Sequence, residues 1–201
     1  MTTLNQRLDQ LNERIQTACA SSNRALSEVL LIGVSKYQPG QSVAQAHELG
    51  LTDFGENYLQ EAAEKIQSLG DKQLTWHFIG SIQSNKTKVI AESFQWVHTV
   101  DRLKIAQRLS SQCPECKVLN ILLQVNVDND LNKGGANPET CIDLVKQMSN
   151  LPNLKLRGLM SILSQDTDPR VGYETVAQLH AALKGELHPA FTAAWDTLQW
   201  A

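Results

Sequence analysis

The feature that most constrains the fold is a regular alternation of short apolar runs with longer amphipathic segments. Apolar runs of strand length cover residues 30–34, 53–55, 75–79, 96–100, 119–127 and 154–162. Segments with helical spacing of apolar residues cover residues 42–49, 58–69, 86–94, 103–111, 138–149 and 171–184. Strands that alternate with helices form parallel βαβ units with right-handed crossovers. The pattern therefore predicts an α/β protein, either a TIM-type (β/α) barrel or a doubly wound sheet.

Two absent motifs weaken the second alternative. No G-x-G-x-x-G follows the first apolar run, and no G-x-x-x-x-G-K-[ST] occurs anywhere in the chain. These glycine-rich turns cradle phosphate groups in nucleotide-binding doubly wound folds. A further amphipathic helix is expected before the first strand, because Leu4, Leu8, Leu11 and Ile15 have helical spacing.

Composition and charge exclude several classes of protein. The 201 residues carry a formal net charge of −3, which gives no general attraction for nucleic acid or for acidic membrane surfaces. No apolar run reaches the length of a membrane-spanning helix, and the polar N-terminus does not resemble a signal peptide. Cys113 and Cys116 form a C-x-x-C without a second pair, so a reduced surface loop is expected rather than a metal site. We expect a cytoplasmic protein.

The first apolar run ends at Lys36, and Pro39 and Gly40 follow closely. We expect residues 30–34 to form an interior strand that leads into a turn. Active sites of α/β barrels lie at the carboxyl ends of the strands. Desolvation there lowers the pKa of a lysine and makes its amine a nucleophile toward carbonyl groups. Lys36 is thus either a Schiff-base lysine in a dry pocket or a strand-end residue that points into solvent.

Other residues that could carry chemistry accompany the second, third and sixth runs. They are Asn57, His77, Gly80 and Met160. In a barrel, these positions converge on one face. Each also has a structural interpretation: Asn57 as a helix cap, His77 as a hydrogen-bonded core histidine and Met160 as core packing. The prediction of a site therefore depends on convergence and not on any single residue.

Five motifs stand in a fixed order along the chain. They are Val34-Ser35-Lys36, Asp53-Phe54-Gly55-Glu56-Asn57-Tyr58, Trp76-His77-Phe78-Ile79-Gly80, His98-Thr99-Val100-Asp101 and Arg157-Gly158-Leu159-Met160. Together they resemble the YggS/PROSC family of pyridoxal phosphate homeostasis proteins, and the resemblance extends over residues 4–198. It implies a barrel similar to the N-terminal domain of alanine racemase.

The resemblance also implies a cofactor and a site. Pyridoxal phosphate would be held as a Schiff base on Lys36, with Asn57, His77, Gly80 and Met160 around its ring. The family is regarded as a carrier or regulator of this reactive cofactor without established turnover. The implied partner is thus a small-molecule cofactor, with no nucleic acid and no membrane.

The C-terminal residues depart from the family pattern. Residues 1–201 are expected to form a single barrel domain of about six βα units that lacks the last two strands and their phosphate-binding segments. The ending Leu198-Gln199-Trp200-Ala201 is what a one-base deletion in a family-like Leu-Ser-Met-Gly-Met would encode, so we treat truncation by a frameshift or sequencing error as a hypothesis. Two alternatives stay open: a Schiff-base-forming enzyme, dependent on pyridoxal phosphate or of the aldolase type, and an inactive remnant.

Overall fold

A curved sheet of parallel strands forms the centre of the protein. The computed structural model describes residues 3–128, 130 and 133–200. Within this part of the chain the sheet has seven strands in the sequential order β1-β2-β3-β4-β5-β6-β7. They are β1 (Gly33–Val34), β2 (Asp53–Glu56), β3 (Thr75–Phe78), β4 (Trp96–Val100), β5 (Leu119–Val125), β6 (Leu154–Ser161) and β7 (Thr197–Trp200). Sequential order with parallel pairing is the topology of a (β/α) barrel, and the predicted fold class is confirmed as a partial barrel.

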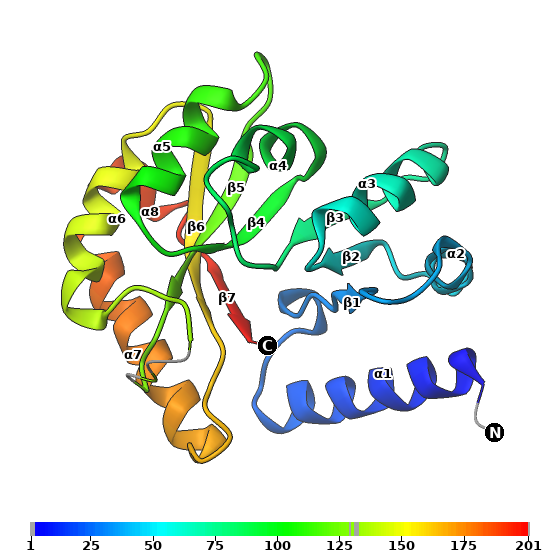
Figure 1. Cartoon of the computed structure of the whole chain (residues 1–201). Coiled ribbons are helices and arrows are strands. Elements are labelled where there is room, and N and C mark those ends of the chain that lie inside the picture. Colours follow the sequence, from blue (N-terminus) through cyan, green and yellow to red (C-terminus); the bar gives the residue numbers. More distant parts are fainter. Residues whose placement is uncertain (1–2, 129, 131–132, 201) are drawn as a thin grey trace.

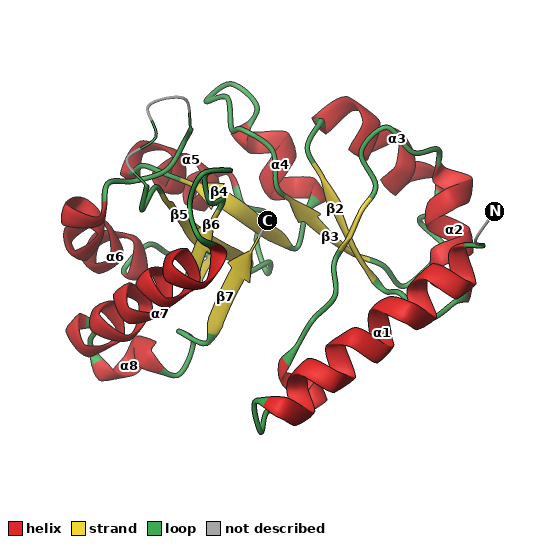
Figure 2. Ribbon diagram, turned by 90° about the horizontal axis from the view of Figure 1, so that it is seen from below, coloured by secondary structure: helices red, strands yellow, loops and turns green. Residues whose placement is uncertain are grey.

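The helices lie outside the curved sheet (Figure 1; Figure 2). They are α1 (Leu4–Ser21), α2 (Gly40–Glu48), α3 (Leu59–Ser68), α4 (Thr87–Ser93), α5 (Leu103–Gln112), α6 (Cys141–Ser149), α7 (Pro169–Glu186) and α8 (Pro189–Thr192), with single turns of 3-10 helix at Leu26–Glu28 and Pro138–Thr140. Local capping explains where two of them begin. Thr3 and Gln6 form a capping box at α1, and Asp168 accepts two backbone N–H groups ahead of Pro169 at α7.

The hydrophobic core lies between the outer face of the sheet and the helices. The sheet contributes Phe54, Trp76, Phe78, Val97 and Leu159, among others. The helices contribute their apolar stripes, which include Val43, Ala62, Ile90, Ala91, Ile105, Leu109, Val145, Met148, Val176 and Leu183. Since side chains alternate along a strand, the residues between these core positions face the inner side of the partial barrel.

Two predictions about strands were wrong. The run 30–34 is not an interior strand: β1 has two residues, stands at one edge of the sheet, and leaves Leu30 and Val34 more than half exposed. The chain was expected to supply about six βα units, yet Thr197–Trp200 forms a seventh strand that pairs with β6 over four residues. Apolar composition predicted burial for residues 30–34, but an edge position has a neighbour on one side only.

Packing around Trp195 explains why the last strand forms. Trp195 is fully buried, donates a hydrogen bond from Nε1 to the His180 carbonyl at 3.0 Å and stacks on the His180 ring. The guanidinium of Arg157 then binds both carboxylate oxygens of Asp196 at 2.9 and 2.7 Å. These contacts position Thr197 beside β6, where it pairs with Gly158.

Candidate functional site

Lys36 lies in the turn that follows β1, and its side chain is exposed. The pairs Gly33↔Phe54 and Val34↔Gly55 set the register of β1 against β2. The hydrogen bond from Ser35 N to Gly55 O, at 3.0 Å, extends that register, which places Lys36 level with Asn57. The dry pocket expected around Lys36 is not formed by the described residues. Because β1 is an edge strand, the sheet has a neighbouring strand, β2, on one side of this lysine only.

Asn57 and Gly80 are brought together at the carboxyl ends of β2 and β3. A Cβ atom on Gly80 would lie 2.7 Å from the carbonyl carbon of Asn57, so residue 80 has to be glycine for the two backbones to meet. The absence of a side chain at Gly80 therefore allows the Asn57 backbone to come close to it. The side chain of Asn57 does not cap α3, and its Oδ1 is buried without a hydrogen-bond partner among the described residues.

His77 is buried on the inner side and joins two neighbouring strands. Its Nε2 lies 3.0 Å from Asp53 Oδ1 on β2, and its Nδ1 lies 2.9 Å from His98 Nε2 on β4. The ring stacks on Trp96 with a centroid distance of 5.7 Å. The hydrogen-bonded core histidine considered for His77 is thus what the structure contains, with Asp53 and His98 as partners that the sequence analysis did not assign to it.

Proton accounting assigns the direction of these bonds. A carboxylate only accepts, so His77 donates from Nε2 to Asp53. In the neutral state His77 Nδ1 then accepts from His98 Nε2, which leaves His98 Nδ1 without a proton. That buried nitrogen has no hydrogen-bond partner among the described residues.

The pKa values of Asp53 and His98, the two residues hydrogen-bonded to His77, are shifted. Burial, followed by the charge of His77, lowers the pKa of His98 to about 3. For Asp53, burial raises the pKa, but hydrogen bonds from His77 and Thr52 outweigh it and the pKa lies below its ordinary value. At neutral pH the hydrogen-bonded series Asp53–His77–His98 therefore contains an ionised Asp53 and a neutral His98.

Met160 is almost fully buried and stands apart from the outer core. It pairs with Gln124 on one side and Gln199 on the other. An irregularity in the pairing of β5 and β6 leaves Arg157 as an extra residue, and it shifts the alternation so that Leu156 and Leu159 both face the helices. Met160 then belongs to the inner side, as does His77, which is on a different part of the sheet.

Sequence analysis missed a buried polar cluster behind Lys36. Lys65 on α3 is 6% exposed and Glu56 on β2 is fully buried. Lys65 Nζ lies 2.6 Å from Glu56 Oε1 and 2.6 Å from the carbonyl oxygen of Ser35, the residue before Lys36. A usable signal existed in the sequence, because Lys65 interrupts an apolar helical stripe formed by Ala62, Ile66 and Leu69.

The C-x-x-C segment lies between α5 and β5, with Cys113 buried and Cys116 exposed. All four cysteines are free thiols. No group of three or more His, Cys, Asp or Glu in the described ranges could hold a metal ion. Of the helices in the same ranges, none is both long enough and apolar enough to cross a bilayer.

Comparison with protein families gives one match that covers most of the chain. Residues 7–192 match the family model "Alanine racemase, N-terminal domain". A pyridoxal phosphate homeostasis protein of Pasteurella multocida is 44% identical over 199 residues, covering 98% of this chain and 85% of the relative. A protein of the same name from Pseudomonas aeruginosa is 48% identical over 184 residues, covering 91% and 80%.

Solved structures agree with these matches. PipY of Synechococcus elongatus PCC7942 is 28% identical, covers 92% of this chain and 95% of its own, and superposes with TM-scores of 0.77 without PLP and 0.75 with PLP bound. An alanine racemase of Clostridium difficile 630 is 11% identical over 96% of this chain and half of its own, with a TM-score of 0.70. The latter likeness concerns the fold alone.

Proposed function

The chain belongs to the pyridoxal phosphate homeostasis proteins of the alanine racemase N-terminal domain family, and from this we propose that it binds pyridoxal phosphate through Lys36 and serves in the homeostasis of that cofactor. The observation that carries the proposal is the position of Lys36 at the carboxyl end of β1, level with Asn57. A relative of the same fold, PipY, has been solved with PLP bound.

Residues at the strand ends and on the inner side of the partial barrel fit such a cofactor. Asn57 Oδ1 is a buried acceptor without a partner among the described residues, and an acceptor in that state costs free energy until a donor reaches it. His77 and Met160 provide a buried polar group and an apolar group on the inner side. We propose Asn57, His77, Gly80 and Met160 as the residues around the cofactor ring, with Gly80 acting through the position of the Asn57 backbone.

Lys36 supplies the one covalent contact in this proposal. The neutral amine would add to the cofactor's aldehyde and release one water, which leaves a C=N bond to Nζ. When bound, pyridoxal phosphate supplies an electrophilic aldehyde and an electron-withdrawing ring. The exposure of Lys36 gives the aldehyde direct access to the amine, and the same exposure favours release, which suits a carrier.

We further propose that the protein carries the cofactor without turning over a substrate. The homeostasis names of its relatives support this, and so does the position of His77, which is engaged with Asp53 and His98. The location we propose is the cytoplasm, which the four free cysteines support.

The test is a visible absorption spectrum of the chain with added pyridoxal phosphate, followed by borohydride reduction and peptide mapping. We expect an imine band and a reduced adduct on Lys36, and both should disappear in Lys36→Ala. Lys88→Ala, at an exposed lysine on α4, is the matched control. An adduct spread over surface lysines without enrichment at Lys36 would contradict the proposed site, and amino-acid or aldol turnover that disappears in Lys36→Ala would contradict the carrier role.

A further inference from the structure

The turn that carries Lys36 has an uncommon backbone conformation. It runs from Ser35 to Gln38, whose amide donates to the Ser35 carbonyl at 3.0 Å. Lys36 and Tyr37 are its two central residues, and Tyr37 has a φ of 61°. This left-handed region at the third turn position is usually taken by glycine, and a bulky residue stays there only when its surroundings hold it.

Helix α3 and the residue before it supply contacts on both sides of Lys36. Lys65 Nζ donates to the Ser35 carbonyl at 2.6 Å. Glu61 Oε2 accepts from the backbone N–H of Tyr37 at 2.9 Å. The hydroxyls of Tyr37 and Tyr58 are hydrogen-bonded, and their rings lie 5.2 Å apart between centroids. The backbone is therefore tied down immediately before and immediately after Lys36.

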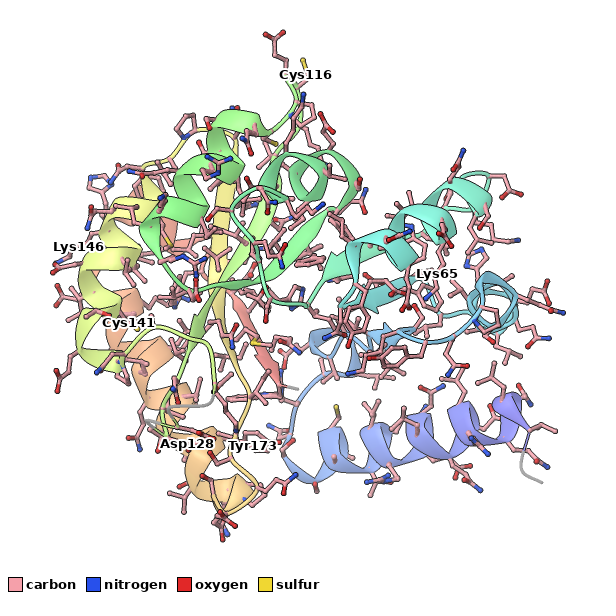
Figure 3. The ribbon with its side chains drawn as sticks, in the orientation of Figure 1. Lys65, Cys116, Asp128, Cys141, Lys146 and Tyr173 are labelled. Carbon is pink, nitrogen blue, oxygen red and sulfur yellow. The ribbon has the colours of Figure 1, made fainter. Side chains whose placement is uncertain are left out.

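Lys65 connects this turn to the sheet. Figure 3 shows its side chain between α3 and the strands β1 and β2. Glu56 Oε1 accepts from Lys65 Nζ and from Ser35 Oγ, each at 2.6 Å. A buried ion pair is often no more stabilising than apolar side chains of the same volume. What an apolar side chain at position 65 could not do is donate to the Ser35 carbonyl.

These contacts lie on the helix side of the sheet. Gly33 faces Leu51 and Phe54 on the helix side, and Ser35 reaches Glu56 and Lys65 on that same side. By alternation along β1, Val34 faces the opposite, inner side of the partial barrel. Holding Ser35 toward α3 therefore fixes the residue from which the turn of Lys36 begins.

We propose that Lys65, anchored by Glu56, is a positioning residue that fixes the turn of Lys36 and so presents its amine to the cofactor. This rests on the proposed function, in which Lys36 binds pyridoxal phosphate. Lys65 itself touches neither the cofactor nor the reacting atoms.

The first test uses the protein without cofactor. Trypsin cleaves after lysine, so the rate at which it cuts the Lys36–Tyr37 bond reports how often the turn opens. In Lys65→Met we expect this rate to rise about tenfold to hundredfold, the factor that corresponds to losing a charged hydrogen bond. Lys65→Arg, which retains a charged donor, should recover part of the protection.

Lys117→Met is the matched control. Lys117 lies between α5 and β5 and is half-buried, and it too donates to backbone carbonyls, those of Ala91 and Glu92 at the end of α4, at 2.7 and 2.9 Å. We expect Lys117→Met to lower the melting temperature without faster cleavage at Lys36. Equal cleavage at Lys36 in the two variants would overturn the proposal, because loss of Lys65 would then act through general stability.

The second test measures the rate of imine formation with pyridoxal phosphate, and we expect it to fall in Lys65→Met and not in Lys117→Met. An unchanged rate and spectrum in Lys65→Met would overturn the positioning role. If the unmodified protein forms no adduct at Lys36, the proposed function fails, and with it any positioning of Lys36 for the cofactor. The trypsin result separates that failure from a failure of Lys65 to hold the turn.

Discussion

The backbone of Asn57 occupies the space in which a side chain on Gly80 would have to begin. This contact joins the carboxyl ends of β2 and β3, where a Cβ atom on residue 80 would approach the oxygen, carbon and Cα atoms of Asn57. Both residues belong to motifs that carry the family resemblance. The glycine is thus required by the fold of the site itself.

Gly80→Ala is expected to destabilise the protein by about 1–3 kcal/mol, because the new methyl group meets backbone that has little freedom to move. Denaturant unfolding measures this change. Gly185→Ala is the control, since nothing lies within 4 Å of a Cβ at that helical position and the substitution should be neutral or stabilising. Similar losses in the two variants would contradict the contact.

A second glycine governs the last strand. Gly158 has a φ of 150°, and a Cβ there would lie 2.9 Å from the carbonyl carbon of Thr197. We expect Gly158→Ala to detach β7 from β6 and to speed hydrogen exchange of the backbone amides of residues 197–200, while the amides of β2 and β3 keep their protection. Unchanged protection of residues 197–200 would show that β7 pairs without this glycine.

The buried His98 predicts a dependence of stability on pH. Its pKa in the folded protein is about 3, mainly through burial, and the ordinary pKa is 6.5. Between these values the unfolded chain binds the proton and the folded chain does not, so stability falls as the pH decreases from 6.5 toward 3. The limiting slope is about 1.4 kcal/mol per pH unit for one proton.

Denaturant unfolding at pH 7, 6, 5 and 4 tests this, with the His98→Gln variant compared to the parent. The difference between the two curves isolates His98 from the carboxyl groups that titrate in the same range. His98→Gln should flatten the pH dependence, whereas His188→Asn, at an exposed helix cap, should leave it unchanged. A parallel pair of curves for His98→Gln and the parent would disprove the assignment.

The pair formed by Glu56 and Lys65 predicts a large cost when one partner is removed. Glu56→Ala leaves the Lys65 ammonium buried with fewer partners, and breaking a buried pair in this way costs about 3–5 kcal/mol. Glu28→Ala removes one partner of the exposed Arg24–Glu28 pair, for which a change below about 1 kcal/mol is expected. Chemical denaturation of both variants checks the difference, and a small loss for Glu56→Ala would mean that water reaches Lys65.

Much of the fold followed from local sequence patterns. The strand β4 was predicted at its observed bounds, and the helices differed by a few residues at their ends, because hydrophobic periodicity reports which face of an element is buried. The predicted positions of Lys36 and Asn57 at strand ends were also correct, since turn residues and polar residues mark those ends along the chain.

Tertiary structure alone decided which of these residues meet and how far they are buried. The chain of Asp53, His77 and His98 spans three strands, and the attachment of Lys65 to Ser35 joins a helix to a turn thirty residues earlier. The strand β1 is exposed because it lies at the edge of the sheet. The strand β7 forms because Trp195, just before it, packs against α7. Periodicity in the sequence identifies a buried face, but contacts between distant segments depend on the register and curvature of the assembled sheet.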